Sequence, residues 1–119
     1  MKQKQDCCWG IGAVDVPVLQ VRDGLIESST AREIASIFAS FSDPTRLRLV
    51  SMLVNKEMCV SELAMALGMS QSALSHQLSD MRQAHLVRSR CEGRHVFYIL
   101  DDPHVRDLFR QALEHAQHR

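Results

Sequence analysis

The stretch from residue 64 to residue 98 constrains the fold most, because two helical patterns and two strand patterns follow one another there almost without a linker. The helical patterns meet at a tight turn that contains Gly68. Ser70 follows, and its hydroxyl can accept from a backbone N–H in the first turn of the second helix. Apolar residues then recur with a period close to 3.6, at Ala73, Leu74, Leu78 and Met81. This pattern predicts a helix that begins after Ser70 and buries one face.

The other face of that helix carries short hydrogen-bonding side chains instead of long charged ones. Side chains of this kind are suited to reading base edges in the major groove of DNA. The residues expected to face bases and phosphates are Ser70, Gln71, Ser72, Ser75 and His76. The alternative is an ordinary solvated helix face.

A β-hairpin is expected directly after this helix. Residues 87–91 and 95–100 alternate in polarity, and Glu92 and Gly93 supply the turn. Arg90, Arg94 and His95 would lie on this wing and contact phosphate or the minor groove, unless they are simply exposed hairpin charges. A helix, a short turn, a polar-faced helix and a hairpin predict a winged helix-turn-helix, a mainly α fold with a β-hairpin wing.

The length of 119 residues suits a single folded domain. No apolar run approaches the roughly 20 residues of a membrane span, and no signal-peptide core is visible, so we expect a cytoplasmic protein without membrane contact. The formal net charge is zero, which argues against non-specific coating of nucleic acid. Between residues 70 and 100, however, four arginines face two carboxylates, so the basic excess falls on the predicted DNA-binding element.

Two domains of unequal order are expected. Residues 1–29 are weakly patterned and predict a flexible arm, whereas residues 30–119 form the DNA-binding and dimerisation domain. Thr30, with Glu33 three residues later, predicts a capping box at the start of the first long helix. Pro44 is suited to the first helical position and predicts the start of the next helix, on which Arg46 and Arg48 should stay exposed. A helix over residues 60–67 should pack under the reading helix.

A last helix is expected from Pro103 to about Gln117, with Asp102 as its cap. Its apolar stripe consists of Val105, Leu108, Phe109, Ala112 and Ala116. Because this stripe has nothing else to cover, it predicts an antiparallel partner helix across a two-fold axis.

The histidines of this helix suggest a metal site shared between two subunits. His104 and His115 are eleven residues apart, roughly 16 Å along the axis, so one chain cannot bring them to one ion. In an antiparallel pair, Asp102 and His104 would approach His115 and His118 of the partner helix. One carboxylate and three imidazoles suit tetrahedral Zn(II), with Co(II) as a mimic, whereas six-coordinate Ni(II) would need further ligands. The alternative is that the histidines are merely solvated and Asp102 only caps the helix.

Four cysteines in a small cytoplasmic chain are free thiols or metal ligands more often than disulfides. Cys7 and Cys8 are adjacent, Cys59 precedes the helix over residues 60–67, and Cys91 lies at the hairpin.

Together, SDPTRLRLVSML (42–53), EMCVSELAMALGMSQSALSHQL (57–78) and GRHVFYIL (93–100) resemble the ArsR/SmtB family of metal-responsive repressors. The match covers about residues 31–119. The ending D-x-H-x10-H-x2-H, here Asp102, His104, His115 and His118, resembles the zinc-sensing subgroup. This resemblance implies a homodimer, formed through its N- and C-terminal helices, that binds operator DNA when metal-free and releases it on binding Zn(II).

The chain departs from the family at a second metal site. Members that sense cadmium, lead or arsenic carry C-V-C, where this chain has Cys59, Val60 and Ser61. Cys7 and Cys8 could still reach Cys59 of the other subunit, and three thiolates would favour Cd(II), Pb(II) or As(III). Alternatively, Cys59 is only a small buried residue and the Cys7–Cys8 pair binds metal without regulating. Cys91 is read as an uncommitted thiol.

Two other classes of protein are alternatives to a metal-responsive repressor. A metal-independent winged helix would bind DNA constitutively or serve as an interaction module. A hydrolytic zinc enzyme would need an open coordination position, which four protein ligands do not leave, and the chain has no H-E-x-x-H motif. We therefore expect no enzymatic activity.

Overall fold

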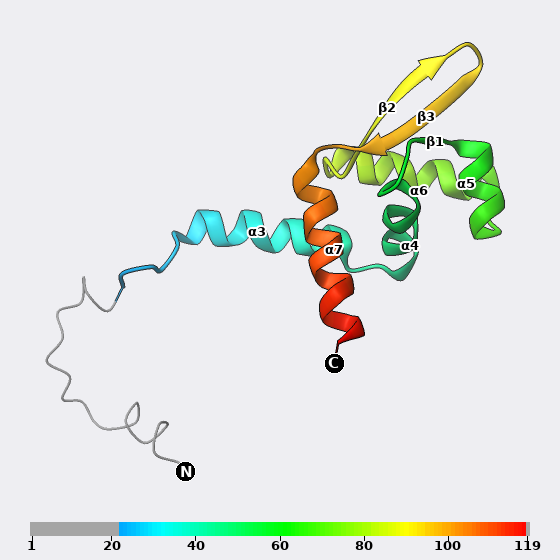
Figure 1. Ribbon diagram of the computed structural model, residues 1–119. Helices are drawn as coiled ribbons and strands as arrows, with labels where there is room; N and C mark the ends of the chain where they lie inside the picture. The colour runs from blue at the N-terminus through cyan, green and yellow to red at the C-terminus, as the bar shows by residue number, and fades with distance from the viewer. Residues whose placement is uncertain (1–21, 119) are drawn as a thin grey trace, which may run out of the picture. The chain divides into compact units, whose positions relative to one another are not determined.

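The computed structural model describes residues 22–118 (Figure 1). The chain divides into two units after Ala31, and the folded core lies in the second, residues 32–119. The predicted arm over residues 1–29 falls largely outside the described residues and stays a prediction. None of the helices in the described part is both long and apolar enough to cross a membrane.

Two helices precede the DNA-binding motif. Helix α3 spans Ser28–Phe41, and α4 spans Pro44–Leu53. The predicted start of α4 is confirmed, since Asp43 caps it by accepting from the Arg46 N–H at 3.0 Å and Pro44 occupies the first turn. The predicted start of α3 at Thr30 is wrong. The helical hydrogen bonds already begin with the Ala31 N–H donating to the Glu27 carbonyl, so Thr30 lies within the first turn.

The helix-turn-helix consists of α5, Val60–Leu67, and α6, Gln71–Gln83. Gly68 ends α5 in the left-handed conformation at φ +69°, which a residue without a Cβ adopts at little cost. The Ser70 hydroxyl accepts from the Ala73 N–H at 3.1 Å and so caps α6 as predicted. Of the predicted apolar face, Leu74, Leu78 and Met81 are fully buried, whereas Ala73 is exposed.

The wing consists of β2, Val87–Glu92, and β3, His95–Leu100, and it projects away from the helices in Figure 1. Glu92 pairs with His95, so the turn comprises Gly93 and Arg94 and begins one residue later than predicted. The sequence did not reveal β1, Met58–Cys59, which pairs with β3 to give a three-stranded antiparallel sheet of order β1-β3-β2. The fold is a winged helix-turn-helix, as predicted.

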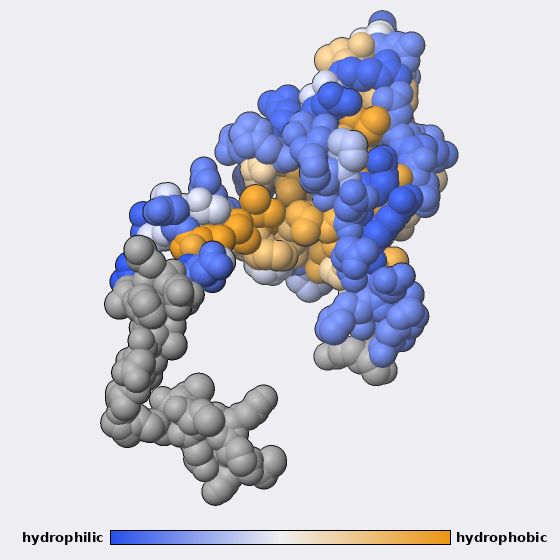
Figure 2. Space-filling view, turned by 60° about the vertical axis from the view of Figure 1, so that its left-hand side comes forward, coloured by the Kyte–Doolittle hydropathy of each residue, from blue (hydrophilic) through white to orange (hydrophobic). Residues whose placement is uncertain are grey.

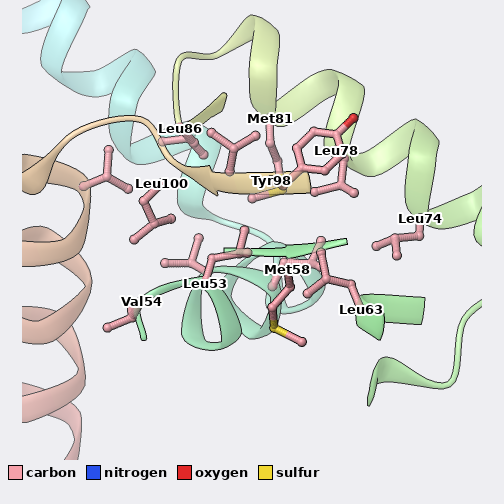
Figure 3. Packing of buried hydrophobic residues seen from close by; sticks show 14 of the residues in the cluster. Leu53, Val54, Met58, Leu63, Leu74, Leu78, Met81, Leu86, Tyr98 and Leu100 are labelled. Carbon is pink, nitrogen blue, oxygen red and sulfur yellow. The ribbon is translucent and has the colours of Figure 1, made fainter. Parts of the chain in front are cut away.

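The core lies where α4, α5, α6 and the sheet meet. Figure 3 shows Leu53 and Leu63 on one side of the sheet residue Tyr98 and Leu78 and Met81 on the other. The fully buried side chains come from α4, α5, α6 and β2, and the largest are Leu49, Val50, Leu53, Leu63, Leu74, Leu78, Met81 and Val87. Burial of each large aliphatic side chain contributes roughly 1.5–3 kcal/mol to stability. The packing of this cluster therefore holds α6 against α4, α5 and the sheet.

Helix α7 spans Pro103–Gln117, with Asp102 as its N-cap, as predicted. The prediction that the whole apolar stripe of α7 packs against a partner helix is wrong in part. Val105 is 6% exposed, and Phe109 packs against the same chain's core, because the first two turns of α7 lie over α4 and β3. Leu108, Ala112 and Ala116 remain exposed.

Candidate nucleic-acid interface and metal ligands

All five residues of α6 and its cap that were predicted to meet DNA are exposed. They are Ser70, Gln71, Ser72, Ser75 and His76. Leu74 and Leu78, on the opposite face of α6, are completely buried. Their burial fixes the rotation of the helix about its axis. Because the apolar face of α6 packs in the core, its polar face points to solvent.

The reading helix and the wing share an open cleft. It has a volume of about 400 Å³ and is lined by Gln71 and Ser75 of α6 and by Arg94 and His95 of the wing. Cys59 and Ser61, at the start of α5, also form part of its wall. The fold thus brings together four residues from two separate sequence patterns, the polar helix face and the hairpin.

Arg90, the remaining predicted wing contact, is tied to its own chain. Its Nε lies 3.1 and 3.0 Å from the two carboxylate oxygens of Glu57, its Nη2 also donates to Glu57, and its Nη1 lies 3.3 Å from Glu92. The guanidinium stacks 4.8 Å above the centre of the Phe97 ring. The hydrogen bond from Arg90 holds the pKa of Glu57 below its ordinary value, and the same pair raises the pKa of Arg90. We call this arrangement of Arg90, Glu57 and Phe97 the wing latch.

The wing latch was not predicted, because nothing in the sequence connects its members. Glu57 lies 33 residues before Arg90 and looks like an ordinary loop carboxylate. Only the pairing of β1 with β3 brings the segment that contains Glu57 next to the wing.

Asp102 and His104 lie together at the start of α7. Asp102 Oδ1 accepts from the His104 N–H at 2.7 Å and from the Val105 N–H at 3.2 Å, and His104 Nδ1 lies 3.5 Å from the same oxygen. Both cap hydrogen bonds end on Oδ1, so Oδ2 takes no part in the cap. The His104 side chain is 89% exposed. A carboxylate oxygen and an imidazole are therefore available at this end of the helix.

His115 and His118 lie at the other end of α7, and both are exposed. His115 is in the last turn, and His118 is the residue that ends the helix. Across residues 22–118, no three His, Cys, Asp or Glu side chains are placed to hold one metal ion. The four predicted ligands thus form two pairs, and a single chain does not bring the pairs together.

The two cysteines in the described part of the chain differ in exposure. Cys59 is buried at 9% exposure, and its Sγ lies 3.2 Å from the Ser61 hydroxyl. Its backbone N–H donates to Glu62 at 3.1 Å, and this bond lowers the pKa of Glu62. Cys91 is exposed on the wing. Cys7 and Cys8 lie outside the described residues, so the proposed thiolate site remains a prediction.

Exposed apolar side chains gather near α3 and α7. Phe38 is 58% exposed, Ile37 44% and Leu108 38%. Ile37 and Leu108 line one cleft of about 300 Å³, which also reaches Asp102 and His104. Figure 2 shows an apolar area on one face of the molecule, bordered by hydrophilic surface. Large side chains left in water on adjoining elements mark this area as a candidate interface.

Comparison with known proteins identifies related regulators. The model of the family described as "Bacterial regulatory protein, arsR family" matches residues 43–89. The "Transcriptional repressor SmtB homolog" of Synechocystis sp. is 43% identical over 100 residues, covering 84% of this chain and 76% of that protein. The "HTH-type transcriptional regulator NmtR" of Mycobacterium tuberculosis is 39% identical over 93 residues, covering 78% of each.

Two solved structures share the fold over most of their length. The solution structure of apo-NmtR matches with a TM-score of 0.71 at 34% identity and covers 92% of this chain and 86% of that chain. The crystal structure of the AntR antimony-specific transcriptional repressor matches with a TM-score of 0.72 at 33% identity, covering 91% and 100%.

Proposed function

The chain belongs to the ArsR/SmtB family of helix-turn-helix transcriptional regulators, and from this premise we propose that it is a zinc-responsive repressor. It binds operator DNA as a metal-free homodimer and is released when Zn(II) binds. Its relatives are regulators of transcription and not enzymes. The observation that carries the proposal is the placement of Asp102 and His104 at one exposed end of α7 and of His115 and His118 at the other.

DNA binding is supported by the exposed polar face of α6 and by its shared cleft with the wing. Gln71 and Ser75 line this cleft and would offer hydrogen-bonding groups to base edges, while Arg94 and His95 on its other side would contact the phosphate backbone. In a two-fold dimer the two copies of α6 would enter successive major grooves about one helical turn apart. Each half of the operator would then be contacted by the same side chains, those of one subunit on one half and those of its partner on the other.

Dimerisation is supported by the exposed apolar side chains of α3 and α7. Phe38, Ile37 and Leu108 would be covered by the corresponding patch of a second copy, because an isologous interface uses the same surface of both subunits. An antiparallel arrangement of the two α7 helices would set the Asp102–His104 pair of each subunit against the His115–His118 pair of the other.

The donor set fits zinc. One carboxylate oxygen and three imidazole nitrogens complete a tetrahedral site, and the cap of α7 leaves Asp102 Oδ2 free for it. Ligation at both ends would fix the angle between the two α7 helices and so the separation of the two reading heads. A coupling of about 1–3 kcal/mol between metal and DNA binding is typical of such regulation.

A second candidate inducer is a soft ion such as Cd(II), Pb(II) or As(III), bound by Cys7, Cys8 and Cys59. It is favoured by the similarity to AntR, an antimony-specific transcriptional repressor, and by the placement of Cys59 in the cleft beside the reading helix. Thiolates prefer such ions to harder ones. If neither the α7 ligands nor the cysteines bind a metal ion, the protein is a metal-independent DNA-binding regulator.

The first experiment is a titration of the reduced, metal-free protein with Co(II), followed by optical absorption. The proposal expects intense tetrahedral ligand-field bands at one ion per subunit, without a sulfur charge-transfer band. A sulfur charge-transfer band that appears first would favour the cysteine site instead. If no binding occurs, the metal-responsive part of the proposal fails, although DNA binding could still be tested.

A further inference from the structure

Arg46 lies at a junction of three helices. Its Nε donates to Gln77 Oε1 at 3.3 Å, and its Nη2 lies 3.6 Å from Asp80 Oδ2, both on α6. Its Nη1 donates to the Ser40 carbonyl at 3.4 Å, in the last turn of α3. The side chain is only 25% exposed. The expectation that Arg46 stays in water is therefore wrong, whereas Arg48 on the same helix is exposed as predicted.

The contacts of Arg46 with Gln77 and Asp80 lie along one side of α6. Gln77 and Asp80 are half-buried and lie between the buried face of α6 and its exposed reading face. The buried leucines resist rotation of the helix, but an apolar contact has no preferred direction and tolerates small tilts. A planar guanidinium with donors in fixed directions specifies orientation more narrowly. Arg46 thus connects α4 to Gln77 and Asp80 of α6 by contacts that have a fixed direction.

The third contact links this arrangement to another part of the molecule. The Ser40 carbonyl belongs to α3, the helix that also carries the exposed side chains of Ile37 and Phe38. A shift at the end of α3 would pull on the same guanidinium that holds Gln77 and Asp80. Among residues 22–118, no other side chain forms hydrogen bonds to both α3 and α6.

We propose that Arg46 is a positioning residue for DNA reading, which sets the angle of α6 and makes it follow α3. The inference rests on the proposed function, because it takes α6 as the reading helix and α3 as part of the dimer interface. Arg46 itself has no role as a phosphate contact in this proposal, since its Nε, Nη1 and Nη2 atoms face Gln77, Ser40 and Asp80 within the chain.

The test compares Arg46→Met with Arg48→Met, which removes the same charge from the exposed side of the same helix. Binding is measured by fluorescence anisotropy on two duplexes: one selected in vitro from a random library by the wild-type protein, and one of unrelated sequence. Arg46→Met is expected to weaken binding to the selected duplex at least tenfold and to leave the unrelated duplex unchanged. Its salt dependence should equal that of the wild type, and Arg48→Met should retain the full specificity ratio.

Three results would overturn the inference. Unchanged affinity of Arg46→Met for the selected duplex would show that the junction does not position α6. Equal weakening on both duplexes, with a salt slope reduced by about one, would make Arg46 a phosphate contact. Loss of specificity in Arg48→Met to the same extent would make the effect one of charge alone.

A second variant keeps the test decisive if Arg46→Met does not fold. Gln77→Ala removes one acceptor from the flank of α6 and is expected to lower the specificity ratio about threefold with an unchanged melting temperature. A ratio equal to that of the wild type would count against the proposal. Failure of the wild-type protein to select any duplex would instead contradict the proposed function, so the two failures are distinguishable.

Discussion

Asp102 caps α7 with the same carboxylate that is proposed to bind metal: its Oδ1 lies 2.7 Å from the backbone nitrogen of His104. The negative charge also lies at the positive end of the helix dipole, where it is favourable. One side chain is thus assigned to two tasks, and a substitution can be chosen that removes one without the other.

Asp102→Asn should separate helix capping from metal binding. Asparagine is as good an N-cap as aspartate but offers no anionic oxygen. We expect the melting temperature to change little while zinc affinity, measured by competition with a chelator, falls more than tenfold. Asp102→Ala should lose the same zinc affinity and, in addition, about 1 kcal/mol of stability. Unchanged zinc affinity in both variants would remove Asp102 from the ligand set.

Replacement of His104 or His115 by alanine should produce a repressor that zinc cannot release. Neither residue lies on α6 or the wing, so operator affinity in the absence of metal should stay within twofold of the wild type. The measurement is operator binding with and without Zn(II). His85→Asn is the matched control, because His85 is an exposed histidine outside the ligand set and asparagine tolerates its φ of +62°. Lost operator binding in His104→Ala would contradict the assignment.

Gln71→Ala and Ser75→Ala should weaken operator binding and leave zinc affinity unchanged. A good base contact contributes about 1–3 kcal/mol of discrimination, so each change should cost roughly 5- to 150-fold in affinity for the selected duplex. Gln83→Ala, at the far end of the same helix, serves as the control and should bind normally. If all three variants bind alike, the N-terminal half of α6 is not the reading surface.

The wing latch should make stability depend on pH in the acid range. The pKa of Glu57 is lowered in the folded protein by Arg90, so the ionised carboxylate stabilises the fold. This stabilisation is present above the ordinary pKa of 4.5 and is lost as the pH falls through the lowered value. Glu57→Gln should therefore flatten the decline in stability below pH 4.5, as measured by urea unfolding at a series of pH values.

Glu114→Gln provides the comparison for the wing latch, since Glu114 is an exposed carboxylate on α7. Its stability profile should follow that of the wild type. If Glu57→Gln also follows the wild type, the ion pair between Glu57 and Arg90 does not contribute to stability in solution.

The sequence predicted those features that depend on neighbouring residues. The Ser70 cap, the Pro44 start, the helix over residues 60–67 and the two wing strands are all confirmed, since each has a local signal in turn chemistry or periodicity. The two-residue strand β1 has no such signal, because its existence depends on pairing with β3 about 40 residues later.

Side-chain partners across long separations could not be predicted for the same reason. Arg46 looked like a solvated arginine between apolar positions, yet its partners Gln77 and Asp80 lie over 30 residues away. Likewise, the stripe on α7 predicted one face for a partner helix, whereas Val105 and Phe109 of that stripe face the chain's own core. Periodicity identifies an apolar face but not what covers it.

The separation of the ligand pairs along α7 has a thermodynamic consequence. If each zinc ion takes two ligands from one subunit and two from the other, then the isolated subunit holds only half of every site. Zinc binding and subunit association must then strengthen each other by the same factor. The concentration of zinc that induces release would therefore depend on how much of the protein the cell contains, and a scarce regulator would respond only to a higher dose.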